Sequence, residues 1–223
     1  MSLTEREASA TAASPSHSPA KAWRRALELT APIANHPDRI FPRVIEEAAE
    51  KFGEAPALLS DLECLTYRAL AERSNRYARW ALDQGLAKGD AVCLIMPNRP
   101  EYMAIWLGIT SIGAVVALLN TNLAGASLAH CIKIAAPKHI IVAAELMRRF
   151  TSASPDISGA AKIWVHGDGC GEYPRIDANL ELYSGERLRC AERRTVTIED
   201  RALYIYTSEP RGPLRPPTSA MPG

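Results

Sequence analysis

The sequence lacks an excess of charge of either sign. It carries 26 lysine and arginine residues against 25 aspartate and glutamate residues, which gives a formal net charge of +1 at pH 7. A chain that binds nucleic acid or an anionic membrane through its total charge would be strongly basic. We therefore expect no nucleic acid partner. The apolar fraction of 47% and the charged fraction of 23% are typical of an ordinary globular protein.

Cysteine is scarce, and no motif pairs it. The five cysteines are scattered along the chain: Cys64, Cys93, Cys131, Cys170 and Cys190. They form no CxxC pair, and none has a histidine at metal-ligand spacing. These absences argue against a disulfide framework and a zinc site. We expect reduced, mostly buried thiols in a cytoplasmic protein.

A secretory signal is also missing from the start of the sequence. Residues 1–20 carry Glu5, Arg6 and Glu7 and then a run rich in serine, alanine and proline. A signal peptide needs an apolar core of about 7–15 residues, which this segment does not contain. We expect residues 1–20 to be a disordered tail.

Only one apolar run approaches the length of a membrane-spanning helix. Residues 102–119 reach about the minimum of ~17–20 residues that such a helix requires. Gly108 and Gly113 interrupt the run, and Val115 and Val116 favour a strand. We therefore favour a buried helix that ends at Gly113 and a buried strand after it, with a membrane span as the alternative.

Helical patterns and short apolar runs alternate along the rest of the chain. Helices are predicted over residues 21–33, 39–52, 68–84, 100–112, 126–135 and 145–150. Strands are predicted over residues 91–96, 115–119, 139–143, 162–166 and 202–206, after a hairpin of residues 57–59 and 64–66. Continuous apolar strands that alternate with helices indicate an α/β fold, with a mostly parallel sheet and helices on both faces.

Residues 167–199 interrupt this alternation. They are polar and irregular, with one short helical turn predicted at residues 179–183. We expect this segment to run over the surface before the sheet resumes at the last predicted strand.

The junction Tyr206-Thr207-Ser208 is the best candidate for a functional site. Ligands of open α/β sheets bind at the carboxyl ends of the strands, where hydroxyls and backbone N–H groups can hold a phosphate. Taken alone, these three residues also fit an ordinary solvated strand end.

Several motifs of the chain resemble the AMP-forming acyl-CoA synthetases. The similarity spans roughly residues 38–208 and is closest to the branch of fatty acid transport proteins and very-long-chain acyl-CoA synthetases. The motifs are Leu65-Thr66-Tyr67, Gly89-Asp90-Ala91-Val92, Met96-Pro97-Asn98, Trp106-Leu107-Gly108, Leu119-Asn120-Thr121-Asn122-Leu123, Ser127-Leu128-Ala129-His130-Cys131 and Tyr204-Ile205-Tyr206-Thr207-Ser208. The chain departs from this branch at Ala124, where a basic residue is usual.

The resemblance implies an incomplete amino-terminal subdomain of an adenylate-forming enzyme. The family uses ATP, Mg²⁺ and coenzyme A to convert a long-chain fatty acid to its acyl-CoA ester, with AMP and pyrophosphate as products. Of its machinery, this chain keeps Thr207 and Ser208 as the start of the ATP phosphate loop. No residue of the chain matches a catalytic or metal-binding position. Peripheral contact with a membrane stays open as a further implication.

Residues 209–223 depart from the family sequence in a particular way. The family loop continues with a run like GTTGLPKAANVSH, whereas this chain continues EPRGPLRPPTSAMPG. A nucleotide sequence that encodes KAANVSHAR, read one base later, encodes RPPTSAMPG, the sequence of residues 215–223. We infer a single lost base after the Ser208 codon, which makes residues 209–223 an out-of-frame, disordered tail.

The predicted protein is therefore a partial adenylation domain, residues 21–208, without activity of its own. One alternative is a non-catalytic module that binds a partner or an acyl chain, or associates with itself, through a sheet edge left unpaired after the Tyr204 strand. Another is one half of a split synthetase.

Other chemically capable residues are weaker candidates. His130 and Cys131 are adjacent on a predicted helix and point in different directions, so we expect no nucleophile pair. His139 and His166 lie at strand ends and are predicted to be structural or solvated. We expect a solvated turn at Asp61/Glu63 and plain surface at Arg24-Arg25 and Arg193-Arg194. Arg148-Arg149 is a basic patch of only two residues, a weak candidate for contact with acidic headgroups.

Overall fold

The chain divides into two units in a computed structural model of the protein. One unit comprises residues 1–37 and the other residues 38–223. Within them, the structure describes residues 18–61, 63–153, 157, 161–168 and 171–206. The larger unit begins at Asp38, so residues 21–37, which the sequence placed with the adenylation domain, belong to the smaller unit.

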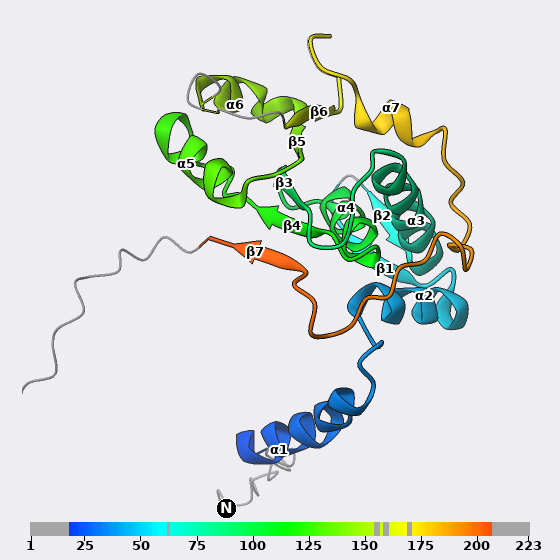
Figure 1. The fold of residues 1–223 in the computed structure, drawn as a ribbon. Coiled ribbons are helices and arrows are strands. Elements are labelled where there is room, and N and C mark those ends of the chain that lie inside the picture. Colours follow the sequence, from blue (N-terminus) through cyan, green and yellow to red (C-terminus); the bar gives the residue numbers. More distant parts are fainter. Residues whose placement is uncertain (1–17, 62, 154–156, 158–160, 169–170, 207–223) are drawn as a thin grey trace, which may run out of the picture. The chain divides into compact units, whose positions relative to one another are not determined.

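The described part of the smaller unit is helical. Helix α1 spans Pro19–Thr30, and the 3₁₀ helix η1 spans Ala31–Asn35 (Figure 1). Proline suits the first helical position because its missing N–H would have no partner within the helix. The helix thus begins at Pro19, two residues inside the segment predicted to be a disordered tail. The predicted helix over 21–33 is confirmed as far as Thr30, and residues 31–33 belong to η1 instead.

The larger unit is built on a parallel sheet of five strands in the order β6-β5-β3-β4-β7 (Figure 1). The strands are β3 Ala91–Ile95, β4 Val115–Leu118, β5 His139–Ala143, β6 Lys162–His166 and β7 Leu203–Ile205. In the central register, Cys93 of β3 lies beside Ile140 of β5 on one side and Ala117 of β4 on the other. Every residue of β3 and β5 is buried, as their continuous apolar sequences predicted.

Strand β7 differs from its prediction. Residues 202–206 were expected to form a buried strand, but β7 has three residues, and Ile205 is 68% exposed. The reason is position: among the described residues, β7 pairs with β4 alone and forms an edge of the sheet. An apolar sequence does not distinguish an edge strand from a central one.

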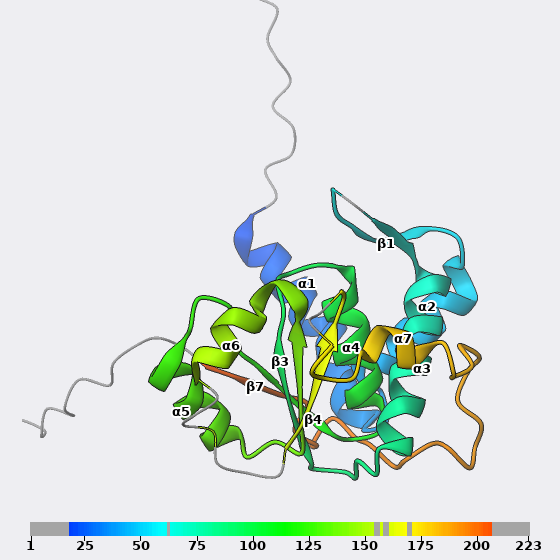
Figure 2. The same cartoon turned by 90° about the horizontal axis from the view of Figure 1, so that it is seen from above.

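Helices cover both faces of the sheet, as predicted. Figure 2 shows α5 and α6 on one face and α3 and α4 on the other. These helices are α3 Tyr67–Asp83, α4 Pro100–Ser111, α5 Gly125–Ala135 and α6 Met147–Ala153, which follows the 3₁₀ helix η2 Ala144–Leu146. The core between sheet and helices contains the fully buried side chains of Tyr77, Trp80, Ile105 and Phe150.

The apolar run at residues 102–119 forms a helix and then a strand. Helix α4 ends at Ser111, Gly113 turns the chain with a φ of +82°, and β4 follows. Gly108 lies against α3 so closely that an added Cβ would be 2.4 Å from the backbone oxygen of Ser74. Within the described residues, no helix combines the length and the apolar character needed to cross a membrane.

A helix and a hairpin precede the sheet. Helix α2 spans Phe41–Phe52, and strands β1 Pro56–Leu59 and β2 Cys64–Thr66 form the predicted antiparallel hairpin. The Thr66 hydroxyl caps α3, because the Ala69 N–H donates to its Oγ1 at 3.1 Å.

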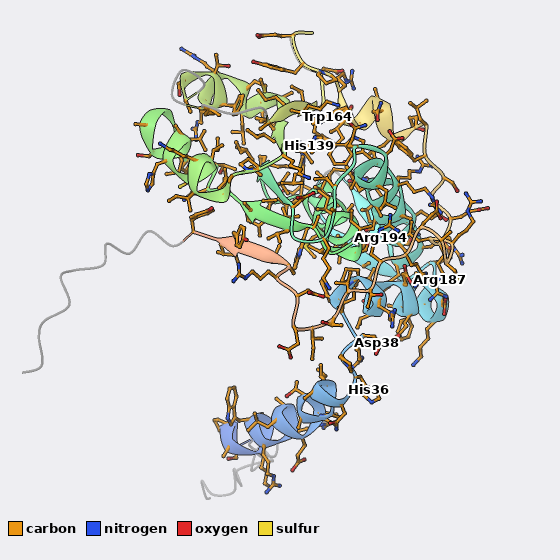
Figure 3. The ribbon with its side chains drawn as sticks, in the orientation of Figure 1. His36, Asp38, His139, Trp164, Arg187 and Arg194 are labelled. Carbon is orange, nitrogen blue, oxygen red and sulfur yellow. The ribbon has the colours of Figure 1, made fainter. Side chains whose placement is uncertain are left out.

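The segment between β6 and β7 is an ordered strap, which we define as residues 184–196. It follows helix α7 Ile176–Leu180, which begins three residues before the predicted turn at residues 179–183. Arg79 of α3 holds the strap by donating to the backbone oxygens of Ser184 and Glu186, each at 2.6 Å. The strap buries Leu188 and carries the exposed side chains of Arg187 and Arg194 (Figure 3).

The four cysteines among the described residues are free, but they are less buried than predicted. Cys93 is buried and Cys131 half-buried, whereas Cys64 and Cys190 are exposed. Burial raises the pKa of the Cys93 thiol to about 12. Cys170 lies outside the described residues.

Candidate functional site

Three strands end together at a groove on the carboxyl edge of the sheet. The segments that follow β3 and β4 line this groove, and the end of β7 lines it as well. The groove has a volume of about 410 Å³ and is lined by Met96, Pro97, Asn98, Tyr102, Leu118, Leu119, Asn120, Thr121, Ile205 and Tyr206. This is the edge at which open α/β sheets bind ligands.

The lining joins apolar walls to neutral polar groups. Met96 and Leu119 are buried, while the amides of Asn98 and Asn120 are exposed. Tyr206 is half-buried, and burial raises its pKa, so the phenol stays protonated and can donate a hydrogen bond. No described residue in the lining carries a carboxylate. A negatively charged ligand therefore meets no like charge from this lining.

The loop after β4 is held in place by hydrogen bonds. The Asn122 N–H donates to Asn120 Oδ1 at 2.9 Å, and the Arg149 guanidinium donates to the Thr121 carbonyl. These contacts fix the polar side of the groove before any ligand binds. The sequence indicates Arg149 only as part of a basic patch, whereas in the structure it holds the loop after β4.

Thr207 and Ser208, the predicted phosphate-binding residues, lie outside the described residues. They follow directly on Tyr206, whose side chain lines the groove. Their role in phosphate binding stays a prediction.

Near the start of α4, the structure has a second polar cluster that the sequence did not predict. Glu101 is 7% exposed, and its carboxylate accepts a hydrogen bond from the Tyr77 hydroxyl and one from Arg73 at 2.6 Å. Burial alone would raise the pKa of Glu101, but hydrogen bonds from His166 and Tyr77 and the charge of Arg73 hold it below its usual value. A charged residue inside the otherwise apolar α4 was the signal that could have indicated it.

The tautomer of His166 follows from its neighbours. Arg99 lies 3.2 Å from Nδ1 of His166, and a guanidinium can only donate. Nδ1 must therefore accept, which leaves the proton of a neutral ring on Nε2, 3.6 Å from Glu101. Arg99 also binds Glu145 at 2.9 Å, so the cluster ties α4 to β6 and η2. This arrangement confirms a structural role for His166.

His139 is also structural, as predicted. It is 4% exposed at the start of β5, and the Trp164 indole N–H donates to its Nδ1 at 3.0 Å (Figure 3). Burial lowers the pKa of His139, and the charge of Lys162 lowers it further. The ring lies at the amino end of its strand, away from the groove.

The remaining candidates do not assemble into a catalytic site. On α5, His130 is exposed and Cys131 half-buried. The predicted solvated turn at Asp61/Glu63 is wrong for Glu63, because its carboxylate pairs with Arg73 at 2.8 Å. Arg193 similarly binds Glu46 at 3.0 Å. Across the described residues, no three His, Cys, Asp or Glu side chains lie close enough to hold a metal ion.

The sequence matches the AMP-binding enzyme family over residues 45–208. It is 33% identical over 149 residues to long-chain fatty acid transport protein 6 of Mus musculus, covering 66% of this chain and 24% of that protein. It is 32% identical over 180 residues to long-chain fatty acid transport protein 2 of Rattus norvegicus, covering 79% of this chain and 29% of that protein. The chain thus spans about a quarter of the length of these relatives.

Solved structures share the fold. An anthranilate CoA ligase in complex with anthranoyl-AMP superposes with a TM-score of 0.69 at 20% identity, over 75% of this chain and 32% of that one. A Mycobacterium tuberculosis fatty acyl CoA synthetase superposes with a TM-score of 0.63 at 22% identity, over the same shares. The parallel sheet and its helices are thus those of the amino-terminal subdomain of adenylate-forming enzymes. The chain belongs to the AMP-binding enzyme family, as an amino-terminal portion related to the long-chain fatty acid transport proteins.

Proposed function

We propose that this chain is the amino-terminal part of the adenylation domain of a fatty acid–CoA ligase. The whole enzyme activates a long-chain fatty acid with Mg-ATP, releases pyrophosphate, and transfers the acyl group from the adenylate to coenzyme A. The observation that carries this proposal is the groove at the carboxyl edge, which ends at Tyr206 directly before Thr207 and Ser208. The match to AMP-binding enzymes over residues 45–208 supports it.

The groove fits a nucleotide better than it fits a bare metal ion. The amides of Asn98 and Asn120 and the hydroxyls of Thr121 and Tyr206 can form hydrogen bonds with a ribose or a phosphate. Magnesium prefers carboxylate and phosphate oxygens, and the described lining offers no carboxylate. In this proposal the phosphates of ATP hold the Mg²⁺, and the protein holds the nucleotide.

We further propose that this chain, with its present residues 209–223, does not catalyse the reaction alone. Pro210 and Pro213 remove two N–H donors from the position of the phosphate loop. Glu209 places a negative charge where phosphates would bind, and like charges ~4 Å apart cost about 1–4 kcal/mol. The functional part in this proposal is residues 21–208, and residues 209–223 are an out-of-frame tail.

Two experiments test these statements separately. Purified chain is incubated with ATP, coenzyme A and oleate, and we expect no oleoyl-CoA; its formation by this chain would contradict the inactivity. The DNA of the locus is then read beyond the Ser208 codon. If the alternative reading frame does not continue into synthetase-like sequence, the inference of a lost base is wrong.

If the frame continues, the restored protein tests the enzymatic function itself. We expect it to form oleoyl-CoA in an ATP-dependent reaction. Asn120→Asp places a carboxylate in the groove and should raise KM for ATP at least about fivefold, because one like charge costs about 1–4 kcal/mol. Glu47→Gln, at an exposed position on α2, is the matched control. Activity that does not depend on ATP would overturn the proposed function.

A second candidate function is association through the edge of the sheet. Among the described residues, β7 has a single strand neighbour and leaves Ile205 68% exposed. Unpaired strand edges template pairing with another chain. Sedimentation velocity over a range of concentrations tests this candidate, and a monomer that melts cooperatively at all concentrations would exclude it.

A further inference from the structure

Helix α1 presents an apolar face that no described residue of its own unit covers. At about 3.6 residues per turn, its large apolar residues gather on less than half of the helix circumference. Trp23 is 69% exposed, Leu27 53% and Leu29 66%, and no residue of α1 is buried. A helix of 12 residues is marginal in water without a partner for such a face.

The opposite face of α1 is basic. It carries Lys21, Arg24 and Arg25 against a single acidic residue, Glu28. Glu28 lies 3.5 Å from Arg24, so the one negative charge is already paired. Lys21 and Arg25 have no ion-pair partner among the described residues. The whole chain is nearly neutral, but this helix has a local excess of two positive charges.

We propose that α1 binds an anionic lipid surface and lies in the plane of the interface. A tryptophan and leucines opposite a lysine- and arginine-rich face are the features of interfacial helices, and tryptophan favours the headgroup level. At 1.5 Å per residue, the helix is about 18 Å long and therefore shorter than the ~30 Å hydrocarbon core of a bilayer. Acidic headgroups supply the negatively charged partners that Lys21 and Arg25 lack among the described residues.

This proposal assigns the membrane contact to α1 and not to Arg148-Arg149. Arg148 is exposed, but Arg149 is engaged with the Thr121 carbonyl and the groove loop. The proposal is independent of the catalytic function, because lipid binding by α1 requires neither ATP nor coenzyme A. Failure of either proposal leaves the other standing.

Co-sedimentation of the full chain with vesicles tests the proposal. We expect binding to vesicles of phosphatidylcholine with phosphatidylserine, weak binding to phosphatidylcholine alone, and loss of binding as salt rises. Leu27→Glu should weaken binding at least about tenfold, because a leucine no longer enters the interface. Leu182→Glu is the matched control: Leu182 is 77% exposed in the larger unit, so this change should leave binding unaltered.

Two further variants separate charge from apolar contact. Replacing Lys21 and Arg25 together by glutamine should lower binding to anionic vesicles about 25-fold, since each basic residue near the surface contributes about fivefold. Trp23→Phe should abolish the blue shift of tryptophan emission that vesicles induce. Trp80 and Trp164 are buried, and Trp106 is half-buried in the larger unit, so these three tryptophans should contribute little to that shift.

Three outcomes overturn the proposal. The first is an absence of binding to anionic vesicles. The second is binding that Leu27→Glu leaves unchanged. The third is self-association that this variant abolishes while binding to vesicles stays the same, which would assign the face to a second copy of the chain.

Discussion

A single carboxylate connects much of the larger unit. Glu101 on α4 contacts Tyr77 and Arg73 on α3, and it faces His166 at the end of β6. Through Arg73 the cluster extends to Glu63 beside the hairpin. Buried charges contribute to stability only when all of their partners are present, because an unpaired buried charge is costly. The cluster is therefore sensitive to the loss of any one member.

Removing the charge of Glu101 tests this dependence. Glu101→Gln should lower the free energy of unfolding by about 2–4 kcal/mol, because Arg73 loses its buried partner. Urea denaturation followed by circular dichroism measures the change. Glu47→Gln on the exposed side of α2 should change it by less than about 0.5 kcal/mol. Equal losses in the two variants would contradict a role for the cluster.

The buried His139 predicts how stability responds to pH. Its pKa in the folded protein is lowered, so the unfolded chain binds a proton more readily. The stabilising contribution of the neutral ring is complete above the unfolded pKa of about 6.5 and is lost as pH falls through the lowered folded pKa. The urea midpoint of the wild type should decrease as the pH is lowered from about 7.5 to 5.5, and the midpoint of His139→Gln should decrease less over the same range. An equal fall in both proteins would contradict this prediction.

Among the elements, the strap is held in position mainly by one arginine of α3, because the strap itself has few apolar residues. Arg79 donates to backbone oxygens of the strap and pairs with Glu192 at 2.9 Å. The hydrogen bond from Arg79, the backbone N–H of Arg189 and the charge of Arg79 together lower the pKa of Glu192 to about 2. A segment with few apolar residues is thus held by charge-assisted hydrogen bonds from α3.

Loss of Arg79 should free the strap. Each hydrogen bond to a charged group contributes about 1.5–3 kcal/mol, so Arg79→Ala should speed tryptic cleavage after Arg187 or Arg189 at least about tenfold. Arg68→Ala on the same helix is the control, because Arg68 pairs with Glu54 at the surface instead. Cleavage at the same rate in both variants would show that other contacts hold the strap.

Elements with a strong local pattern were predictable from the sequence. The continuous apolar runs indicated β3 and β5, and Thr66 indicated the start of α3. The edge position of β7 and the burial of Glu101 were not predictable, because both depend on neighbours distant in the sequence. The candidate groove was predicted as a sheet edge beside Tyr206, but the contribution of Asn98 and Asn120 required the strand order.

The whole molecule keeps its core in one unit. All buried hydrophobic side chains of the described residues lie at or beyond Leu65, in the unit that begins at Asp38. A chain that starts at Asp38 should therefore have the same free energy of unfolding in urea denaturation as the full chain, within about 0.5 kcal/mol. The same truncation should remove vesicle binding. A marked loss of stability would show that residues 1–37 contribute to the folded core.

The order of the strands also has a consequence for synthesis on the ribosome. The outer edge of β4 receives β7, but β4 ends at Leu118 and β7 begins only at Leu203. At ~5–20 residues per second, the ribosome needs about 4–17 s to make the intervening chain. During that interval the nascent protein exposes the unpaired backbone edge of β4, so we expect chaperone occupancy to peak there and to fall once β7 has emerged.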